Sequence, residues 1–331
     1  MANKHSTLTD LFSDIANAIR EKTGGSATIV ADDFPNAIAS ISTGPSIPAL
    51  NDASWSMISE LSQAGLASSC WSVGDCKKIV LNGTVGTLEF SGYETYVYII
   101  GFDHNGATNT IDFGTFKTAV SGGKDMALAD SKYNGTSTNG TKYFNMNHWG
   151  NYNYGGWKGC DLRYDVLGST DVAPSGYGSA ATTSRVGYDA SETCATNPVS
   201  GTLMAALPSE LRAVMKPMTV YTDNTGGTTA VASGVTSSVD YLPLLSSYET
   251  FGVNAVEADY QTMYAYYAIG NSRLKVRQND IDGYSIYYFL RTPYYNGYNA
   301  SYFTVVYPVE AVSTTNGGAR FSYGIAPIFR V

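Results

Sequence analysis

The first 43 residues show the periodicity of an amphipathic helix. Apolar side chains recur every three or four positions and form a single stripe, which consists of Leu8, Leu11, Phe12, Ile15, Ala16 and Ile19. Ser6, Thr7 or Thr9 is expected to cap this helix. The two glycines at 24–25 are expected to end it. The pattern therefore predicts one helix over roughly the first half of this segment.

A second, shorter helix is predicted over residues 34–41. Asp32 or Asp33 is expected to cap it, and Pro35 falls in its first turn, where proline is tolerated. Two short amphipathic helices cannot bury their apolar faces alone, because chains below about 40 residues usually need a partner. We therefore expect residues 1–43 to form a helical module for particle attachment or oligomerisation. It would dock on itself, on the rest of the chain or on another protein.

The pattern changes after this module. Residues 44–53 begin with proline, glycine and serine, which is typical of a linker. From residue 54 a second unit is predicted, and Ser54 is expected to cap its first helix. A further helix is predicted over 204–215, with Pro208 at the start of its main part.

Strands make up most of the rest of this second unit. Residues 77–85 resemble a hairpin with an Asn82-Gly83 turn, and residues 96–102 are the clearest strand because they are aromatic and β-branched. A loop-bearing hairpin is expected before Ser238, and short strands continue to the terminus. The predicted class is α+β with long loops.

Composition excludes two kinds of partner. Hydrophobic residues are 44% of the 331, enough for a core, whereas charged residues are only 15% against roughly 25% in a typical domain. The net charge of −8 provides no basic footprint, so we expect no nucleic-acid partner. No apolar run approaches the ~18 residues of a membrane span, so we expect no membrane insertion. The N-terminus also lacks an apolar signal core, which predicts synthesis in the cytoplasm without a signal peptide.

The cysteines do not have the spacing of a zinc or redox site. Cys70, Cys76, Cys160 and Cys194 are expected to be buried free thiols, and a Cys70–Cys76 bridge is the main alternative.

Few residues suggest catalysis. The three histidines are His5, His104 and His148, and the segment 103–105 fits a turn at a strand end better than a metal or catalytic element. Paired carboxylates of a glycosidase need not be close in sequence, and the candidates are Glu249, Glu257 and Asp259. Nothing singles them out. We therefore expect no enzymatic activity and no cofactor. We also expect no metal, since the sequence contains no dense run of calcium ligands.

The aromatic residues carry a stronger signal. Residues 260–302 contain eleven tyrosines, and the run 293–302 is rich in Asn and Gly, which favour a loop. Residues 145–156 have the same character. Tyr, Ser, Gly and Asn are typical of adaptable recognition loops, although such loops also pack on each other or on a neighbouring subunit. The predicted ligand-binding residues are Tyr294, Tyr295, Asn296, Tyr298, Asn299, Tyr302, Asn151, Tyr152 and Tyr154.

Two stretches resemble known families. The segment LFSDIANAIREKTG at 11–24, followed by Ile29, ADDFP at 31–35 and AI at 37–38, resembles a short module in tail and structural proteins of phages and prophages of Gram-positive bacteria. This resemblance implies that the N-terminal module connects the protein to a phage particle.

The remainder resembles an uncharacterised domain family of phage and bacterial surface proteins. The matching positions are Trp55, Ile58, Gly65, Val73 to Asp75, Lys77, Ile99 to Asp103, Gly155 to Trp157, Leu162, Arg163, Leu207 to Ser209, Leu211, Leu244 to Ser246, Glu249, Gly252, Phe289 to Pro293 and Gly324 to Arg330. Residues 309–319 depart from the family, where a shorter turn centred on glycine is expected.

The family's fold is similar to C-type-lectin-like domains, including the variable ligand-binding proteins of diversity-generating retroelements. The resemblance implies loops near the C-terminus that bind, displayed on a scaffold of Trp157, Arg163, Arg291, Pro327 and Phe329. The same fold hosts formylglycine-generating oxidases, whose cysteines lie late in the chain. No cysteine follows Cys194 here, which counts against this enzyme class.

Together these features predict a receptor-binding adhesin of a phage tail tip or baseplate, carried in the virion. Its expected partners are a host cell-surface receptor, either glycan or protein, and other tail or baseplate subunits. A homo-oligomer is expected, and a trimer is the form usual for tail fibres. A structural baseplate or capsid-decoration protein is the main alternative, followed by an envelope-glycan depolymerase.

Overall fold

The computed structural model describes residues 7–39, 47–130, 137–173, 183–184, 192–253, 256–279, 283–308 and 314–331. The chain divides into two compact units, Met1–Pro48 and Ala49–Val331. Predicted features that involve His5, Ser6, Ser42 or residues 309–313 lie outside the described residues.

The first unit contains the predicted helices. Its elements are α1 (Leu8–Thr23), the 3-10 helix η1 (Ala31–Asp33) and α2 (Phe34–Ala39). Thr7 caps α1, because its hydroxyl accepts from the Asp10 N–H at 3.1 Å while the Asp10 carboxylate accepts from the Thr7 N–H at 3.0 Å. Gly24 ends the helix in the left-handed conformation, at a φ of 67°. Periodicity and capping residues therefore located α1 correctly.

The apolar stripe of this unit is only partly covered. Ala16 and Ile19 are buried, and the Phe12 and Phe34 rings meet edge to face at 5.9 Å. Leu8 and Ile38 are exposed. Two short helices thus leave part of their apolar surface open, as their size predicts.

The second unit begins inside the segment predicted as a linker. Leu50 and Ala53 are buried in its core, and the Lys77 ammonium donates to the carbonyls of Asn51 and Ala53. Helix α3 (Trp55–Gln63) follows, with Ser54 as its cap. The compact unit therefore extends further toward the N-terminus than residue 54.

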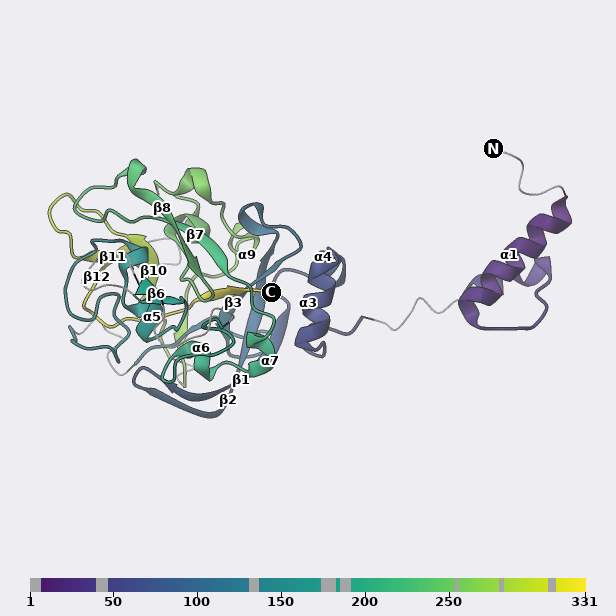
Figure 1. Ribbon diagram of the computed structural model, residues 1–331, viewed down its shortest axis with the longest axis horizontal. Coiled ribbons are helices and arrows are strands. Elements are labelled where there is room, and N and C mark those ends of the chain that lie inside the picture. The colour runs from purple at the N-terminus through teal and green to yellow at the C-terminus, as the bar shows by residue number, and fades with distance from the viewer. Residues whose placement is uncertain are drawn as a thin grey trace. The chain divides into compact units, whose positions relative to one another are not determined.

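The largest sheet described in this unit has four antiparallel strands. In sheet order its strands are β1 (Cys76–Val85), β2 (Leu88–Phe102), β3 (Ile111–Lys117) and β13 (Ile328–Arg330). Figure 1 shows β1 and β3 near α3. The hairpin predicted within residues 77–85 is wrong, because the whole segment is one strand and the turn lies at 86–87. The Asn82-Gly83 pair instead marks a register shift in the ladder between Leu81 and Gly83.

The C-terminal strand β13 is the last strand of this sheet and contacts helix α3 through Phe329 and Trp55. Arg330 forms a bidentate ion pair with the buried Asp112, at 2.6 and 2.7 Å. The Phe113 and Phe329 rings stack at 5.1 Å, and Trp55 lies edge to face against both. The charge pair thus joins β13 to β3, and the aromatic packing joins the C-terminal strand to the first helix of the unit.

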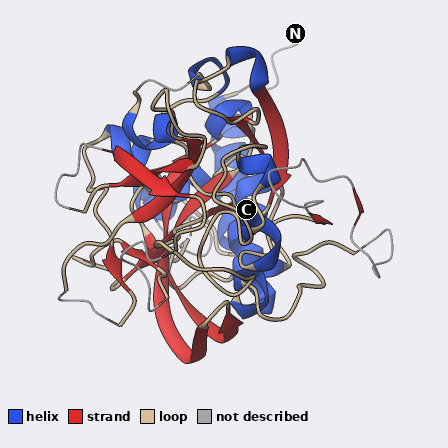
Figure 2. Cartoon of the chain, turned by 90° about the vertical axis from the view of Figure 1, so that its left-hand side faces the viewer, coloured by secondary structure: helices blue, strands red, loops and turns tan. Residues whose placement is uncertain are grey.

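The remaining strands form smaller sheets. Strands β10 (Tyr288–Pro293), β11 (Tyr302–Val306) and β12 (Thr314–Gly318) make one sheet, and β7 (Met218–Asp223) pairs with β8 (Val235–Asp240) in the predicted hairpin. Two-residue pairs join β4 (Met126–Ala127) to β9 (Val276–Arg277) and β5 (Val172–Ala173) to β6 (Thr183–Ser184). Loops connect most of these short elements (Figure 2). The chain is of the mixed α+β class.

The other helices are short. They are α4 (Ala67–Cys70), η2 (His104–Gly106), η3 (Trp157–Gly159), α5 (Leu162–Asp165), α6 (Leu203–Ala206), α7 (Ser209–Arg212), η4 (Ala232–Gly234), α8 (Ser247–Phe251), η5 (Ala258–Tyr260) and α9 (Ala265–Ala268). The prediction of a single helix over 204–215 is wrong. The segment forms two helices, α6 and α7, because Leu207, directly before Pro208, is extended with a ψ of 149°.

None of the four cysteines forms a disulfide, so the Cys70–Cys76 bridge is not formed. Three of them are buried as expected, whereas Cys70 is half-buried. In the described part of the chain, no helix is both long enough and apolar enough to cross a membrane.

We predict that residues 49–331 fold without the first unit. The large hydrophobic cluster starts at Leu50 and includes no residue of the helical module. Residues 49–331 should therefore unfold within about 2 °C of the full chain, the shift that roughly 1 kcal/mol causes in a domain of this size. Thermal unfolding followed by circular dichroism measures this. A midpoint many degrees lower would mean that the module stabilises the second unit.

Candidate functional site

Three loops converge on one buried side chain, Asn153. Its backbone N–H donates to the Ala300 carbonyl at 2.7 Å, and its amide group donates to the carbonyls of Gly227 and Tyr302 at 3.0 and 3.2 Å. The amide oxygen accepts from the Gly227 N–H at 2.8 Å. The side-chain nitrogen and oxygen of Asn153 thus both have hydrogen-bond partners. These bonds connect loops 147–154, 224–231 and 294–302. We call these three segments the converging loops.

Gly226 allows this close approach. Its φ is 68°, and a Cβ there would lie 2.2 Å from the Asn153 carbonyl oxygen. No other residue type fits a position that combines this conformation with such a contact. The Gly297 N–H also donates to the Thr228 carbonyl at 3.0 Å, which adds a second link between two of the loops.

Asn147 and Asn151 also hold the first of these loops. The Asn147 N–H donates to the Ala319 carbonyl at 2.9 Å, and its side-chain amide donates to the Tyr152 carbonyl. Asn151 accepts from the Arg320 N–H at 3.2 Å. Loop 147–154 is therefore tied to the turn that follows β12.

The converging loops carry large exposed aromatic side chains. Trp149, Tyr152 and Tyr154 are each about half exposed, at 55, 52 and 50%, and Tyr298 is 93% exposed. The Tyr152 and Tyr154 rings lie 6.0 Å apart. We call these four side chains the aromatic set. Tyr152, Tyr154 and Tyr298 were predicted as ligand-binding residues, whereas Trp149 was not selected although it lies within the aromatic stretch 145–156.

The other predicted ligand-binding residues shape the loops. Asn296 accepts from the N–H groups of Tyr298 and Asn299 at 3.0 and 2.9 Å, which forms a tight turn. Asn299 is exposed and donates to the Tyr302 hydroxyl at 3.4 Å. Tyr294 and Tyr302 are partly buried, and their backbones pair through the Tyr294 N–H at 3.0 Å.

Tyr295 is an anchor. Its hydroxyl donates to the Asp223 carboxylate at 2.7 Å, and burial together with this carboxylate raises the pKa of the phenol. Asp223 also accepts from the N–H groups of Thr225 and Val231, at 3.0 and 2.7 Å. The Asp223 carboxylate thus accepts three hydrogen bonds, and two of them shape loop 224–231. Sequence reasoning missed both Asp223 and Asn153, because their partners are far away along the chain.

A pocket of about 650 Å³ lies beside the converging loops. Its polar lining residues are Ser247, Glu257, Thr292, Tyr294, Tyr295 and Thr304. Glu257 is fully buried, and its Oε1 accepts from the Asp223 N–H at 3.3 Å. Its Oε2 has no hydrogen-bond partner among the described residues. Burial raises the pKa of Glu257, and hydrogen bonds from backbone N–H groups and the charge of Arg291 counteract this only in part.

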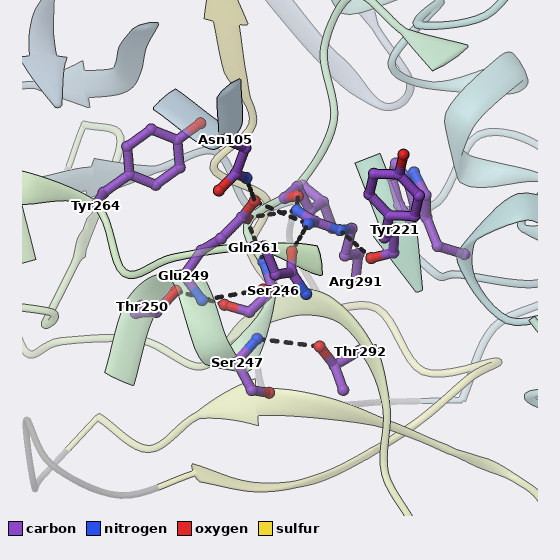
Figure 3. Close-up of polar contacts among 12 residues, drawn as sticks. Asn105, Tyr221, Ser246, Ser247, Glu249, Thr250, Gln261, Tyr264, Arg291 and Thr292 are labelled. Carbon is purple, nitrogen blue, oxygen red and sulfur yellow. Dashed lines mark hydrogen bonds and ion pairs between the residues drawn. The ribbon is translucent and has the colours of Figure 1, made fainter. Parts of the chain in front are cut away.

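Glu249, another candidate carboxylate, has a structural partner. It forms a bidentate ion pair with Arg291, at 2.6 and 2.9 Å, and both side chains are fully buried (Figure 3). Arg291 also donates to the Leu244 carbonyl at 2.7 Å and to the Gln261 side chain. Burial alone would raise the pKa of Glu249, but the charge and hydrogen bonds of Arg291 outweigh it, and the pKa is lowered.

This pair holds the base of the pocket. Glu249 belongs to a capping box with Ser246 at the start of α8, and the Ser247 N–H donates to the Thr292 hydroxyl at 3.0 Å (Figure 3). Arg291 and Thr292 are in β10, directly before the segment that leads to Tyr294 and the exposed loop. The ion pair thus fixes the position from which loop 294–302 departs.

The five residues to which a scaffold role was assigned are all buried: Trp157, Arg163, Arg291, Pro327 and Phe329. Trp157 and Arg163 both donate to the buried Asp240 carboxylate, at 3.1 and 2.8 Å. Residues 309–319, where the chain departs from its relatives, are described only from Thr314, which starts β12.

The remaining catalytic candidates lie apart from the pocket lining. Asp259 is exposed in η5. His104 stacks on the Tyr264 ring at 3.5 Å, and the His148 Nδ1 lies 3.1 Å from the Asp165 carboxylate. Within the described residues, no group of His, Cys, Asp and Glu side chains is arranged to hold a metal ion.

A family model described as Domain of unknown function (DUF6273) matches residues 136–331, which is more than half of the chain and includes all the converging loops. No curated protein and no solved structure matches the chain.

We predict that Asn153→Ala loosens the converging loops. The change leaves the Gly227 N–H and two carbonyls without their partner, which should lower the free energy of unfolding by about 1–3 kcal/mol. Amide hydrogen exchange at Gly227 should accelerate. Asn299→Ala is the control, because Asn299 bonds only within its own loop among the contacts described. Unchanged exchange at Gly227 in Asn153→Ala would show that the amide does not hold the loops.

We also predict that Glu249→Gln destabilises the second unit strongly. Removing one charge leaves Arg291 buried without its partner, which costs about 3–5 kcal/mol in chemical denaturation at pH 7. Because the folded pKa of Glu249 is lowered, its stabilisation is complete above its unfolded pKa of about 4.3 and is lost as the pH falls through the folded value. The difference between parent and variant should therefore shrink in acid.

The control for this variant is Glu94→Gln, which breaks the exposed pair between Glu94 and Lys78. It should leave the unfolding midpoint almost unchanged, since exposed ion pairs contribute little. Equal effects of the two substitutions would contradict the structural role given to the buried pair.

Proposed function

This chain belongs to the family described as Domain of unknown function (DUF6273), and we propose that it is the receptor-binding (adhesin) protein of a bacteriophage tail. It recognises a host cell-surface glycan or protein through the aromatic set on the converging loops. The observation that carries the proposal is the presence of four exposed aromatic rings on loops whose backbones are fixed by a buried amide.

Exposed aromatic rings on a held backbone suit recognition. A tyrosine or tryptophan offers a large contact area and a polar tip, and loses little side-chain entropy on binding. The bonds of Asn153 order the loops before a ligand arrives, so binding loses less conformational freedom. Weak single sites would be compensated by several copies per particle.

The helical module supports a role in the particle. Leu8, Val30 and Ile38 are exposed there, which favours docking on other tail or baseplate subunits or on further copies of this chain. We propose a homo-oligomer, with a trimer as the expected form. A C-type-lectin-like fold is proposed for the second unit. Its buried scaffold residues and its C-terminal loops, both expected from the resemblance, support this assignment.

A binding function is favoured over hydrolysis. A glycosidase of the usual kind needs two carboxyl groups facing one bond. Glu249 is paired with Arg291, and the Asp223 carboxylate is used by loop 224–231, so Glu257 is left without a second free carboxylate in the described pocket lining. The structural alternative, in which the aromatic set contacts another particle subunit, is distinguished by the experiment below.

We predict that a Trp149/Tyr152/Tyr154/Tyr298→Ala variant loses cell binding. Labelled full-length protein is incubated with a panel of intact Gram-positive cells, and bound label is measured by flow cytometry. Truncating interface aromatics commonly costs more than 1 kcal/mol each, so apparent affinity should fall roughly tenfold or more. Because these side chains are exposed, the unfolding midpoint should stay close to that of the parent.

Tyr284→Ala is the matched control. Tyr284 is 95% exposed but lies outside the converging loops, so its removal should leave cell binding unchanged. Equal binding by parent and quadruple variant would refute the role of the aromatic set. Binding of the parent to particle subunits and not to cells would favour the structural alternative.

A further inference from the structure

The pocket beside the converging loops combines three chemical features. Apolar side chains of Ala230, Val253, Val256 and Pro293 line part of it. The hydroxyl-bearing lining residues are Ser247, Thr292, Thr304, Tyr294 and Tyr295, and the Tyr295 hydroxyl is already bonded to Asp223. A buried carboxyl group, that of Glu257, completes the lining.

The carboxyl group of Glu257 is the informative part. Its Oε2 is shielded from water and accepts no hydrogen bond from the described residues. A buried acceptor without a donor is costly, so a ligand that offers an N–H or O–H there gains affinity by relieving the cost. Other buried polar atoms of the described residues, including the Asn145 and Asn147 amide oxygens, also lack a hydrogen-bond partner, but of these residues only Glu257 lines the pocket.

The charge of the lining restricts the ligand. Among the described lining residues there is no lysine or arginine, and Glu257 is the only carboxylic acid. An anionic ligand such as a phosphate would meet a carboxylate without a compensating cation. The apolar lining residues Ala230, Val253, Val256 and Pro293 also disfavour a strongly hydrated ammonium group. A neutral ligand with an N–H donor fits best.

We propose that this pocket binds an N-acetylated amino sugar. The acetamido methyl group packs against Val253 and Val256, and the Glu257 side chain turns toward the pocket on binding, so that the acetamido N–H donates to its Oε2. The sugar ring lies against Tyr294, and its hydroxyl groups bond to the serine and threonine hydroxyls. An acetamido group provides both an apolar methyl and an amide donor, whereas a plain hexose provides only hydroxyls. This inference rests on the proposed function, for which it names the ligand class.

Saturation-transfer NMR on the full-length protein tests the proposal. The probes are N-acetylglucosamine, N-acetylgalactosamine, glucose and glucosamine, each at millimolar concentration. We expect transfer to the acetyl methyl protons of an N-acetylated sugar, and at least tenfold weaker or no binding of glucose and glucosamine. Glu257→Ala should abolish the transfer. Glu257→Gln, which keeps an acceptor oxygen, should retain it within a few-fold, and Tyr284→Ala should leave it unchanged.

Three outcomes overturn the proposal. The first is transfer to no probe, and the second is a preference for glucosamine that is lost in Glu257→Gln, which would make the pocket a cation site. The third is binding of N-acetylated sugars that Glu257→Ala leaves intact although the variant unfolds at the parent's midpoint.

Parallel cell-binding measurements separate this proposal from the proposed function. If the parent binds cells but no sugar probe, the pocket assignment fails and the adhesin proposal stands. If an N-acetylated sugar binds through Glu257 but the parent ignores cells, the adhesin proposal fails and the pocket assignment stands.

Discussion

The buried ion pair between Glu249 and Arg291 is the interaction on which the architecture around the pocket depends. It joins the start of α8 to β10, and Arg291 adds bonds to the Leu244 carbonyl and the Gln261 side chain. A buried charge is tolerated only with a partner of good geometry, and here each charge has two contacts to the other. The positions of Ser247 and Thr292 follow from this pair, and with them one wall of the pocket.

Burial separates the two roles of the polar and aromatic residues in the converging loops. Asn153 and Asp223 are buried and fully bonded, so they fix the backbone. Tyr152, Tyr154 and Tyr298 project from that backbone and remain exposed. Because the side chains that hold the loops differ from those that would contact a ligand, the exposed positions can vary without loss of the fold. This separation is what a recognition surface requires.

The sequence predicted well the features that depend on neighbouring residues, and poorly those that depend on residues far apart in the chain. Helix α1 was located by its spacing and its cap, because both signals lie within a few residues. The Asn82-Gly83 turn was wrong, because β1 runs on through this pair and keeps its pairing with β2 across a register shift, which overrides a local turn preference. Tyr295 and Tyr298 look alike in sequence, yet one is bonded to Asp223 and the other is exposed. That difference depends on a carboxylate more than seventy positions away along the chain, which periodicity cannot reveal.

The central claim, that the converging loops touch the host cell, is tested most directly by photo-crosslinking. A benzophenone amino acid replaces Tyr298 in one full-length protein and Tyr284 in another, and both are irradiated on intact cells. The account predicts that cell-surface material is attached to the protein labelled at 298 and not to the protein labelled at 284. Attachment from both positions alike, or from 284 alone, would contradict it.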